Sequence, residues 1–489
     1  MKKEKYSGYP HLLLTKGVIK EQVYHSIRNA VLDGRMRPGI KIPSSRMLAE
    51  MMSISRNSVL AGFDRLTDEG YLVTKKGSGT YIAETIPDDL IDTKAFPIDS
   101  SETLLSKLKI NPHIHEMLPL WENTREFAKG SAVFNVGVGC VDLFPHELWG
   151  RLLGGVWRQS RNKLGQLNEP AGHASLREII CDYVRTTRGL NCTKEQIIIV
   201  NGTQQAINLT AQVFLQKGDE VWLDEPGYDG ALGVFKSIGA KARPIIGDDQ
   251  GMDIDYGIKN WPNAKLVFTA PSHQFPLGST LSLPRRLALL DWASENDAWI
   301  FEDDYNSEYR YKARPIQALQ GLDKHQRVIY AGTFSKMMFP EFRLAFMVVP
   351  NALINVFTLT KYYEDTRSSY LEQATLALFI SEGHYARHVR KIRRACDERK
   401  KVLEQAIQTY LSDKVQPQPS DSGIHLVCWL LGGLTEQEVI DKCRQIGLGV
   451  QPLSRYCQQP FKKQAILLGY AAHSPDEIVD GVKRLAEII

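Results

Sequence analysis

Short apolar runs alternate with longer segments of helical periodicity from Phe134 onward. This alternation is typical of a mostly parallel sheet that lies between helices. In such sheets ligands bind beyond the carboxyl ends of the strands, so the residues that follow each run are the first candidates for a functional site. The predicted strands are 196–200, 220–223, 265–269, 298–301 and 327–330.

Polar and aromatic side chains with different chemistry follow the first three predicted strands. Gly202 and Thr203 come after the first strand and open a helix, whose N-terminal amides favour a phosphate. The ring of Tyr228, after the second strand, can stack on a planar cofactor. After the third strand, the amide of Gln274 can form a hydrogen bond with a phenolic oxygen. Taken singly, each of these residues also fits an ordinary helix start, turn or polar loop.

Acidic residues follow the fourth predicted strand, and a lysine follows the fifth. The carboxylate of Asp303 or of Asp304 can pair with a protonated pyridine nitrogen, and strand alternation leaves open which of the two does so. Lys336 fits either a solvated loop residue or an amine that forms a Schiff base with an aldehyde cofactor. In the second case Thr333, Ser335 and Arg343 hold the phosphate of that cofactor. The order of phosphate cradle, ring, acid and lysine after successive strands favours the second case.

The charge of the chain is distributed unevenly between its beginning and the rest. Residues 1–83 hold 14 Lys and Arg against 7 Asp and Glu, a net charge of +7. The remaining residues hold 46 against 49, a net charge of −3. A basic first segment on a mildly acidic body indicates that the first segment binds a polyanion.

Three helices are predicted within this basic segment. Residues 18–34 carry Ile19, Val23, Ile27 and Val31 on one face and end at a glycine. A second helix begins at Ser44 or Ser45, and a third spans 56–69 after a cap at Ser55. The predicted apolar face of the second helix consists of Met47, Leu48 and Met51. Two short helices joined by a tight turn form a helix-turn-helix, and the third helix would enter the major groove of DNA with Arg56, Asn57 and Ser58 towards the bases.

A basic hairpin is predicted directly after the third helix. Residues 71–75 and 80–83 form its strands, and the glycines of the intervening Lys76-Gly77-Ser78-Gly79 allow the backbone to approach a phosphate. Lys75 and Lys76 add positive charge. The alternative is a small helical domain with a solvated basic face, but three helices followed by a basic glycine hairpin favour a winged DNA-binding domain.

This first segment is similar to a known family. The stretch GRMRPGIKIPSSRMLAEMMSISRNSVLAGFDRLTDEGYLVTKKGSGTYIA resembles the winged helix-turn-helix of GntR-type bacterial regulators almost from end to end. The resemblance implies double-stranded operator DNA as the partner. It implies that the residues which contact DNA or shape the contacting surface include Ser45, Arg46, Arg56, Asn57, Ser58, Gly77 and Gly79, beside the charged Lys75 and Lys76.

Three segments are predicted along the chain. Residues 1–83 form the DNA-binding domain, and 84–131 form a linker with several prolines and short helices at 102–108 and 120–127. Residues 132–489 form the large domain, which ends in a small C-terminal lobe with strands at 422–430 and 463–469. The predicted fold class is therefore a multidomain α/β protein.

Six motifs of the large domain carry the candidate site residues: PAGHASLREII, NGTQQAINL, EPGYDG, PSHQFPLG, FEDDYNSEYRY and GTFSKMMFPEFRLAF. Together they resemble the fold-type I, class I aminotransferases, which use pyridoxal 5'-phosphate (PLP). They are more closely similar to the effector domain of MocR regulators, in which a GntR head is fused to an aminotransferase-like body. The resemblance covers nearly the whole chain apart from the linker, and it implies a PLP cofactor and a homodimer.

Individual roles follow from the resemblance by motif. It implies Lys336 as the Schiff-base lysine, in an internal aldimine, and Asp303 as the partner of the pyridine nitrogen. It implies contacts to the ring hydroxyl from Tyr305 and Gln274, and stacking by Tyr228. The implied phosphate ligands are Gly202, Thr203, Ser335 and Arg343.

The chain departs from its relatives in two places. Where relatives carry LGYGDPAGH, this chain has Gln166 and Leu167 within LGQLNEPAGH, so a tyrosine that reaches the phosphate of the neighbouring subunit is missing. Aminotransferases also place an arginine for the substrate carboxylate in the C-terminal lobe. The nearest candidate here is Arg455, which we expect to contact the effector.

Several classes of protein are not expected from this sequence. No apolar run reaches the roughly 18 residues that span a bilayer, and residues 11–14 are too short an apolar region for a signal peptide. The seven cysteines are scattered without a CxxC pair, so neither a disulfide framework nor a metal site is expected. These features predict a cytoplasmic protein without a membrane partner.

Two functions from different classes fit the sequence. In the first, the protein is a PLP-dependent transcription regulator, in which an amino compound or a B6 vitamer is sensed through the aldimine of Lys336. In the second, it is a catalytically active aminotransferase with an appended regulatory DNA-binding domain. The basic head and the missing tyrosine favour the regulator, and the complete set of cofactor residues keeps the enzyme in consideration.

Overall fold

The computed structural model describes five stretches of the chain, which are residues 19–85, 111–121, 132–161, 169–311 and 316–489. Contacts divide the chain into two compact units, one within Met1–Lys109 and the other within Ile110–Ile489. The helix predicted at 102–108, most of the helix predicted at 120–127, and the pair Gln166 and Leu167 lie outside the described residues.

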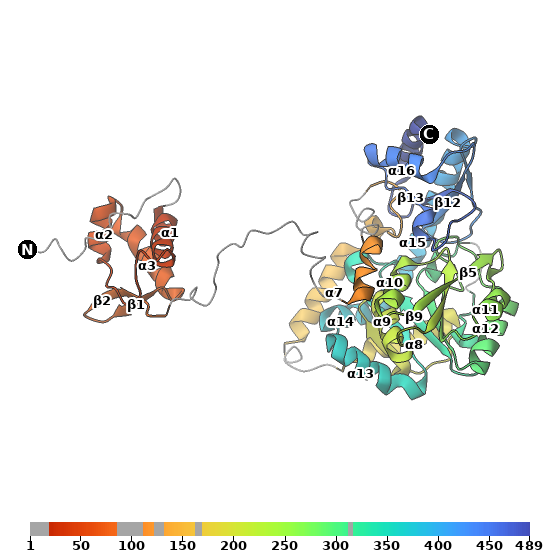
Figure 1. Ribbon diagram of the computed structural model, residues 1–489, viewed down its shortest axis with the longest axis horizontal. Helices are drawn as coiled ribbons and strands as arrows, with labels where there is room; N and C mark the ends of the chain where they lie inside the picture. Colours follow the sequence, from red (N-terminus) through yellow and green to blue (C-terminus); the bar gives the residue numbers. More distant parts are fainter. Residues whose placement is uncertain (1–18, 86–110, 122–131, 162–168, 312–315) are drawn as a thin grey trace, which may run out of the picture. The chain divides into compact units, whose positions relative to one another are not determined.

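The first unit is a winged helix-turn-helix (Figure 1). Val23, Ile27 and Val31 are buried on one face of the first helix, which confirms the predicted periodicity. Ser44 and Ser55 cap the second and third helices by accepting hydrogen bonds from backbone amides. The elements are α1 (Ile19–Leu32), α2 (Ser45–Met52), α3 (Arg56–Asp68), and the antiparallel strands β1 (Leu72–Lys75) and β2 (Gly79–Ile82).

The apolar face predicted for α2 differs from the structure. Leu48 is buried, but Met47 and Met51 are 39% and 49% exposed. The inward face of α2 contains Leu48, Ala49 and the partly buried Met52. Met52 lies three residues after Ala49 and four after Leu48, so the three side chains share one side of the helix. Met47 and Met51 lie four residues apart on the neighbouring stripe, which faces solvent. The prediction counted apolar residues without separating these two stripes.

An eight-stranded sheet forms the centre of the second unit, in the order β3-β10-β9-β8-β7-β4-β5-β6. Its neighbouring strands from β9 to β5 are parallel, whereas β10 is antiparallel to both β3 and β9. All five predicted strands form. The strands are β3 (Ile197–Val200), β4 (Glu220–Glu225), β5 (Lys241–Asp248), β6 (Gly251–Met252), β7 (Leu266–Thr269), β8 (Trp299–Asp304), β9 (Val328–Thr333) and β10 (Ala345–Val348).

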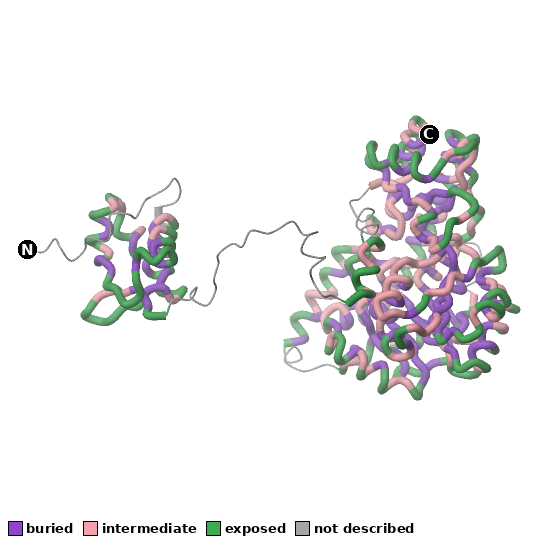
Figure 2. Tube along the Cα trace, in the orientation of Figure 1, coloured by how far each residue is buried: buried purple, intermediate pink, exposed green. Residues whose placement is uncertain are grey.

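Helices cover both faces of this sheet (Figure 1). They include α8 (Ala174–Arg188), α9 (Thr203–Phe214), α10 (Asp229–Ser237), α11 (Ile254–Asn260), α12 (Leu283–Glu295), α13 (Ile354–Asp365) and α14 (Tyr370–Ser381). Ile198 and Val200 of β3 pack with α9, α10 and α13 on one face, and Ile197 and Ile199 pack with α8 and α14 on the other. Both faces are therefore buried, and Figure 2 shows buried residues concentrated in the sheet.

A smaller antiparallel sheet forms the C-terminal lobe, in the order β11-β12-β14-β13. The strands predicted at 422–430 and 463–469 correspond to two of its members. The lobe consists of β11 (Val415–Pro417), β12 (His425–Leu430), β13 (Gln451–Pro452), β14 (Ala465–Gly469), α15 (His384–Tyr410), α16 (Glu436–Gln445) and α17 (Pro475–Ile488). A short 3-10 helix, Leu453–Tyr456, follows β13.

Part of the predicted linker belongs to the second unit. The short helix α5 (Pro112–His115) contacts α10. The approach is close, because a Cβ added to Gly239 would lie 2.7 Å from Nε2 of His113. Residues 111–121 are thus packed on the body.

Candidate functional site

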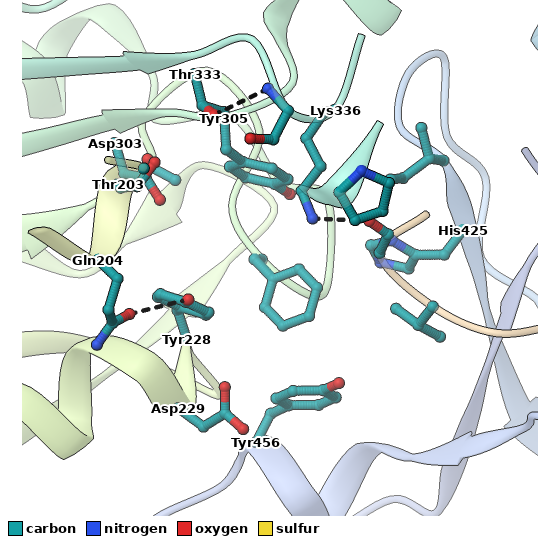
Figure 3. Close-up of a pocket in the computed structure, with 18 of the residues that line it drawn as sticks. Thr203, Gln204, Tyr228, Asp229, Asp303, Tyr305, Thr333, Lys336, His425 and Tyr456 are labelled. Atoms are coloured by element: carbon teal, nitrogen blue, oxygen red, sulfur yellow. Dashed lines mark hydrogen bonds between the residues drawn. The ribbon is translucent and has the colours of Figure 1, made fainter. Parts of the chain in front are cut away.

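A cavity of about 420 Å³ lies beyond the carboxyl ends of β3, β4, β8 and β9, and the C-terminal lobe forms its opposite wall (Figure 3). The strand order explains which residues meet there. Because β9 is paired with β8, the loop that follows β9 and carries Lys336 lies beside the carboxyl end of β8, where Asp303 is the residue before the last. The same loop brings Arg343 back to the end of β3, where Gly202 and Thr203 begin α9.

Lys336 extends its amine into this cavity (Figure 3). Its Nζ donates a hydrogen bond of 2.8 Å to the carbonyl of Gly137. Its own carbonyl accepts a hydrogen bond from the hydroxyl of Tyr309, which fixes the backbone at this point. Burial lowers the pKa of the Lys336 amine, while the nearby carboxylate of Asp303 acts in the opposite direction. The amine is therefore neutral at a lower pH than an exposed lysine would be.

Asp303 and Asp304 point to opposite faces of the sheet. Asp303 follows Phe301 by two residues, so both lie on the same face, and Asp303 lines the cavity. On the other face, Asp304 accepts a hydrogen bond of 2.6 Å from Nε of Arg188 and another from the hydroxyl of Tyr330. Burial, and next the charge of Asp304, raise the pKa of Asp303 to about 7. Its Oδ1 has no hydrogen-bond partner among the described residues.

An anion cradle forms at the start of α9. Gly202 adopts a left-handed conformation with φ of +97°, and a Cβ at this position would lie 3.1 Å from the guanidinium carbon of Arg343. Arg343 donates a hydrogen bond of 2.9 Å to the carbonyl of Asn201. Thr203 lines the cavity here, and the buried Oγ of Ser335 has no hydrogen-bond partner within the described part of the chain. Positive charge, helix amides and a buried hydroxyl together suit a phosphate.

Aromatic rings line the cavity between these groups (Figure 3). The hydroxyl of Tyr228 donates to Oε1 of Gln204 at 3.1 Å, which holds the ring at the cavity wall. Tyr305 follows β8, and burial raises the pKa of its hydroxyl well above the ordinary value, so the phenol stays protonated.

The structure does not bring Gln274 into the cavity with the other predicted residues. Its amide nitrogen donates to the backbone carbonyls of Pro226 and Phe275, and its amide oxygen accepts from the backbone amide of Leu277 at 3.0 Å. The side chain therefore holds together two proline-containing loops. The hydrogen-bonding capacity that the sequence motif suggested for a ring hydroxyl is used within the protein.

Other cavity residues come from parts of the chain that the sequence motifs did not single out. Gly137 precedes the sheet, His425 begins β12, and Tyr456 ends the 3-10 helix of the lobe. Burial lowers the pKa of His425 to about 4, so its imidazole is neutral at ordinary pH, and its Nε2 lies 2.8 Å from the carbonyl of Pro276. These residues approach the others only through the folded chain, so local periodicity carries no signal for them.

Arg455 lies at the cavity, as expected, but it is paired with a residue of this chain. Its guanidinium donates a hydrogen bond of 3.1 Å to Oδ2 of Asp229, which opens α10. Asp229 was not among the predicted site residues. Its only local signal is its position directly after the predicted stacking residue, Tyr228.

The predicted DNA-binding residues gather on the first unit at α2, α3 and the hairpin. Arg46, Arg56, Asn57, Lys75 and Lys76 are exposed. The remaining four have structural roles: Ser45 accepts a hydrogen bond of 3.4 Å from Nε of Arg56, Ser58 takes part in the cap of α3, and Gly77 and Gly79 adopt positive φ angles of +77° and +123° in the hairpin. The exposed groups suit phosphates and base edges.

Neither a metal site nor a membrane span is found in the described residues. None of their His, Cys, Asp and Glu side chains form a group of three or more that could hold a metal ion. Among the helices that the structure describes, none is long and apolar enough to cross a bilayer. All seven cysteines are free thiols.

Two family models match this chain. Residues 155–485 match the family described as aminotransferase class I and II, and residues 19–82 match the family described as bacterial regulatory proteins, gntR family. The two matches correspond to the sheet-containing body and to the winged helix-turn-helix.

Named relatives share both parts. The probable rhizopine catabolism regulatory protein MocR of Rhizobium meliloti is 36% identical over 464 residues, which are 95% of this chain and 92% of the relative. The HTH-type pyridoxine biosynthesis transcriptional regulator PdxR of Corynebacterium glutamicum is 29% identical over 462 residues, 94% of this chain and 93% of the relative.

Among solved structures, kynurenine aminotransferase of Pyrococcus horikoshii, in complex with PMP, is similar in fold. The TM-score is 0.68 at 26% identity, and the match covers 82% of this chain and 98% of that one. The similarity to regulators over almost the full length decides between the two kinds of relative. This chain therefore belongs to the MocR regulators, which join a GntR-type helix-turn-helix to a domain of the aminotransferase class I and II family.

Proposed function

We propose that this chain regulates transcription by binding operator DNA through its first unit while its second unit holds PLP on Lys336 and senses an amino compound or a B6 vitamer. The observation that carries this proposal is a buried lysine amine that shares one cavity with a buried acid and an anion cradle. The names of two relatives support the effector classes, since one concerns rhizopine catabolism and the other pyridoxine biosynthesis.

The cavity residues fit PLP group by group. Gly202, Thr203, Ser335 and Arg343 would hold its phosphate, and the buried Ser335 hydroxyl, which has no partner among the described residues, supports this assignment. Asp303 would face the pyridine nitrogen, because its buried carboxylate has an oxygen available for a donor. We assign stacking on the ring to Tyr228 and a contact to the ring hydroxyl to Tyr305, but none to Gln274.

PLP, when bound, supplies an aldehyde that condenses reversibly with primary amines. The surroundings of Lys336 prepare it for such chemistry. Burial lowers the pKa of its amine, so that more of the amine is neutral and nucleophilic, and the carbonyl of Gly137 orients it. Asp303 would stabilise positive charge on the pyridine nitrogen, and the neutral imidazole of His425 adds no competing charge to the cavity.

The first unit would bind DNA with α3 in the major groove and the hairpin near the backbone. Asn57 and Arg56 are exposed at the start of α3, as base contacts require. We further propose a homodimer, because helix-turn-helix regulators commonly bind two half-sites that lie about one helical turn apart.

A second candidate, a working aminotransferase, is favoured by one specific observation. Burial lowers the pKa of the Lys336 amine, and its neutral form would act as a general base as well as a nucleophile. This candidate predicts keto-acid formation when the PLP-loaded protein is incubated with a panel of amino acids. The regulator requires only binding of the effector, and it is the better supported of the two because of the GntR-type head.

The test combines a cofactor measurement and a DNA measurement on the full chain. The purified protein should show the visible absorbance band of protein-bound PLP, and borohydride reduction should attach the cofactor to the Lys336 peptide. Lys336→Ala should lose the attached cofactor, while Lys259→Ala, an exposed lysine on α11, should keep it. Footprinting should reveal a specific site upstream of the gene or of its neighbour. An unchanged adduct in Lys336→Ala would refute the cofactor assignment, and the absence of any specific footprint would refute the regulator.

A further inference from the structure

An ion pair forms part of the cavity wall at the end away from Thr333. Figure 3 shows Asp229 and Tyr456 close to each other at this end, whereas Lys336 and Thr333 lie at the other. Arg455 donates a hydrogen bond of 3.1 Å to Asp229, and the two side chains are 10% and 22% exposed. Asp229, Arg455 and Tyr456 all line the cavity. A group at the distal end of an effector would therefore meet this pair.

The segments that carry the pair are fastened to each other. The backbone amide of Gly227 donates a hydrogen bond of 2.8 Å to the carbonyl of Tyr456, two residues before Asp229 and one after Arg455. Nearby, Oε1 of Glu225 accepts hydrogen bonds of 2.7 and 3.0 Å from the backbone amides of residues 458 and 459. These contacts hold the two segments that carry the charged side chains against each other.

Local packing stabilises each partner in its place. Asp229 occupies the first turn of α10, where a carboxylate interacts favourably with the helix dipole. The guanidinium of Arg455 lies 5.3 Å from the centre of the Tyr456 ring. That ring packs edge-on against Phe275, at 4.8 Å between centres, and its hydroxyl donates to Gln451. An effector would have to work against these contacts in order to separate the pair.

The pair determines which distal groups the wall accepts. A carboxylate that approaches Arg455 would either displace Asp229 or lie beside its like charge. An ammonium group that approaches Asp229 would either displace Arg455 or lie beside its like charge. Separating a pair that is largely out of water leaves one charge without its counterion, which is strongly unfavourable. A hydroxyl can donate to Asp229 and accept from Arg455 at once, so it leaves the pair intact.

We propose that the Asp229–Arg455 pair makes this site selective for primary amines with a neutral, hydroxyl-bearing distal end, over amines of equal length that end in a carboxylate or in a second ammonium. The proposal rests on the proposed function, because it assumes that the amine end of the effector is bound near Lys336. Asp229 then has a role in specificity, and Arg455 contacts a neutral group of the effector where aminotransferases bind the carboxylate of their substrate.

The experiment titrates the PLP-loaded full chain with three series of compounds of matched length, namely ω-amino alcohols, ω-amino carboxylates and α,ω-diamines. Binding is followed by the shift of the cofactor absorbance band. In the wild type we expect the best amino alcohol to bind about 10-fold or more tightly than its two counterparts, the discrimination that one unmatched charge can produce. Asp229→Asn should improve binding of the amino carboxylates by a similar factor, and Arg455→Gln should improve binding of the diamines.

The control is Asp255→Asn, which removes an exposed carboxylate from the first turn of α11 and should leave all three series unchanged. Tightest binding of a carboxylate or a diamine by the wild type would overturn the proposal. So would unaltered selectivity in both variants, provided that each keeps the cofactor band. A missing cofactor band in the wild type, or no shift with any amine, would instead refute the proposed function and remove the basis of this inference with it.

Discussion

Asp303 shows how a residue suited to binding can oppose folding. Burial, and then the charge of Asp304, raise the pKa of its carboxyl from 3.8 to about 7, so the folded chain holds this proton more tightly than the unfolded chain. The resulting contribution to stability is complete below about pH 4 and is lost as the pH rises through about 7. Near pH 8 and without PLP, we expect Asp303→Asn, which cannot ionise, to have a free energy of unfolding about 4 kcal/mol higher than that of the wild type.

Urea unfolding of the PLP-free proteins at about pH 5 and about pH 8 measures this difference, which should be clearly smaller at the lower pH. The same variant should bind PLP more weakly, because a neutral amide cannot balance a pyridinium charge. Asp249→Asn, at an exposed position, is the control and should alter neither property. A variant that is less stable than the wild type at both pH values would contradict the prediction.

At the scale of elements, α8 is fastened to β8 by a buried ion pair. Nε of Arg188 lies 2.6 Å from Asp304, and the other guanidinium nitrogens donate to the carbonyl of Ile316 and the hydroxyl of Ser272, each at 2.9 Å. Arg188→Ala would leave the carboxylate of Asp304 buried without its cation, so we expect a loss of about 3–5 kcal/mol in the free energy of unfolding. Arg185→Ala, on the exposed face of α8, should change it by no more than about 0.5 kcal/mol. Equal effects of the two substitutions in urea unfolding would argue against this role of the pair.

The helix α3 and the hairpin should contribute differently to DNA binding. Asn57 is exposed at the start of α3, so Asn57→Ala should reduce the preference for the operator by about 1–3 kcal/mol and have little effect on binding to unrelated DNA. Lys75, in the hairpin, should contact phosphate. Lys75→Ala should therefore weaken binding to the operator and to unrelated DNA alike, and should reduce the magnitude of the slope of log K against log salt by about 1. Titrations of both DNAs at several salt concentrations separate the two effects. A uniform loss in Asn57→Ala would place this residue on the backbone instead.

More of the sheet and its binding edge could be predicted from the sequence than of the distal end of the cavity. The five strands, the helix-turn-helix and the order of the motifs could be predicted because apolar runs and helix caps depend on neighbouring residues. The choice between Asp303 and Asp304 needed the folded sheet, which turns Phe301 and Asp303 to one face. The Asp229–Arg455 pair joins residues 226 positions apart, and the use of Gln274 within two loops depends on backbone carbonyls that no motif reports.

At the scale of the whole molecule, regulation requires that the two compact units be coupled. Linkage makes this coupling reciprocal: if an effector changes operator affinity by a given factor, operator DNA must change effector affinity by the same factor, typically about 5–150-fold. We therefore expect the effector titration of the full chain, followed by the cofactor absorbance band, to shift when saturating operator DNA is added. The shift should equal the ratio of operator affinities measured with and without effector. A chain shortened to Ile110–Ile489 should give the same titration with and without DNA. An aminotransferase that merely carries an independent DNA-binding head predicts no shift in the full chain either, so this one comparison separates a sensor from an enzyme.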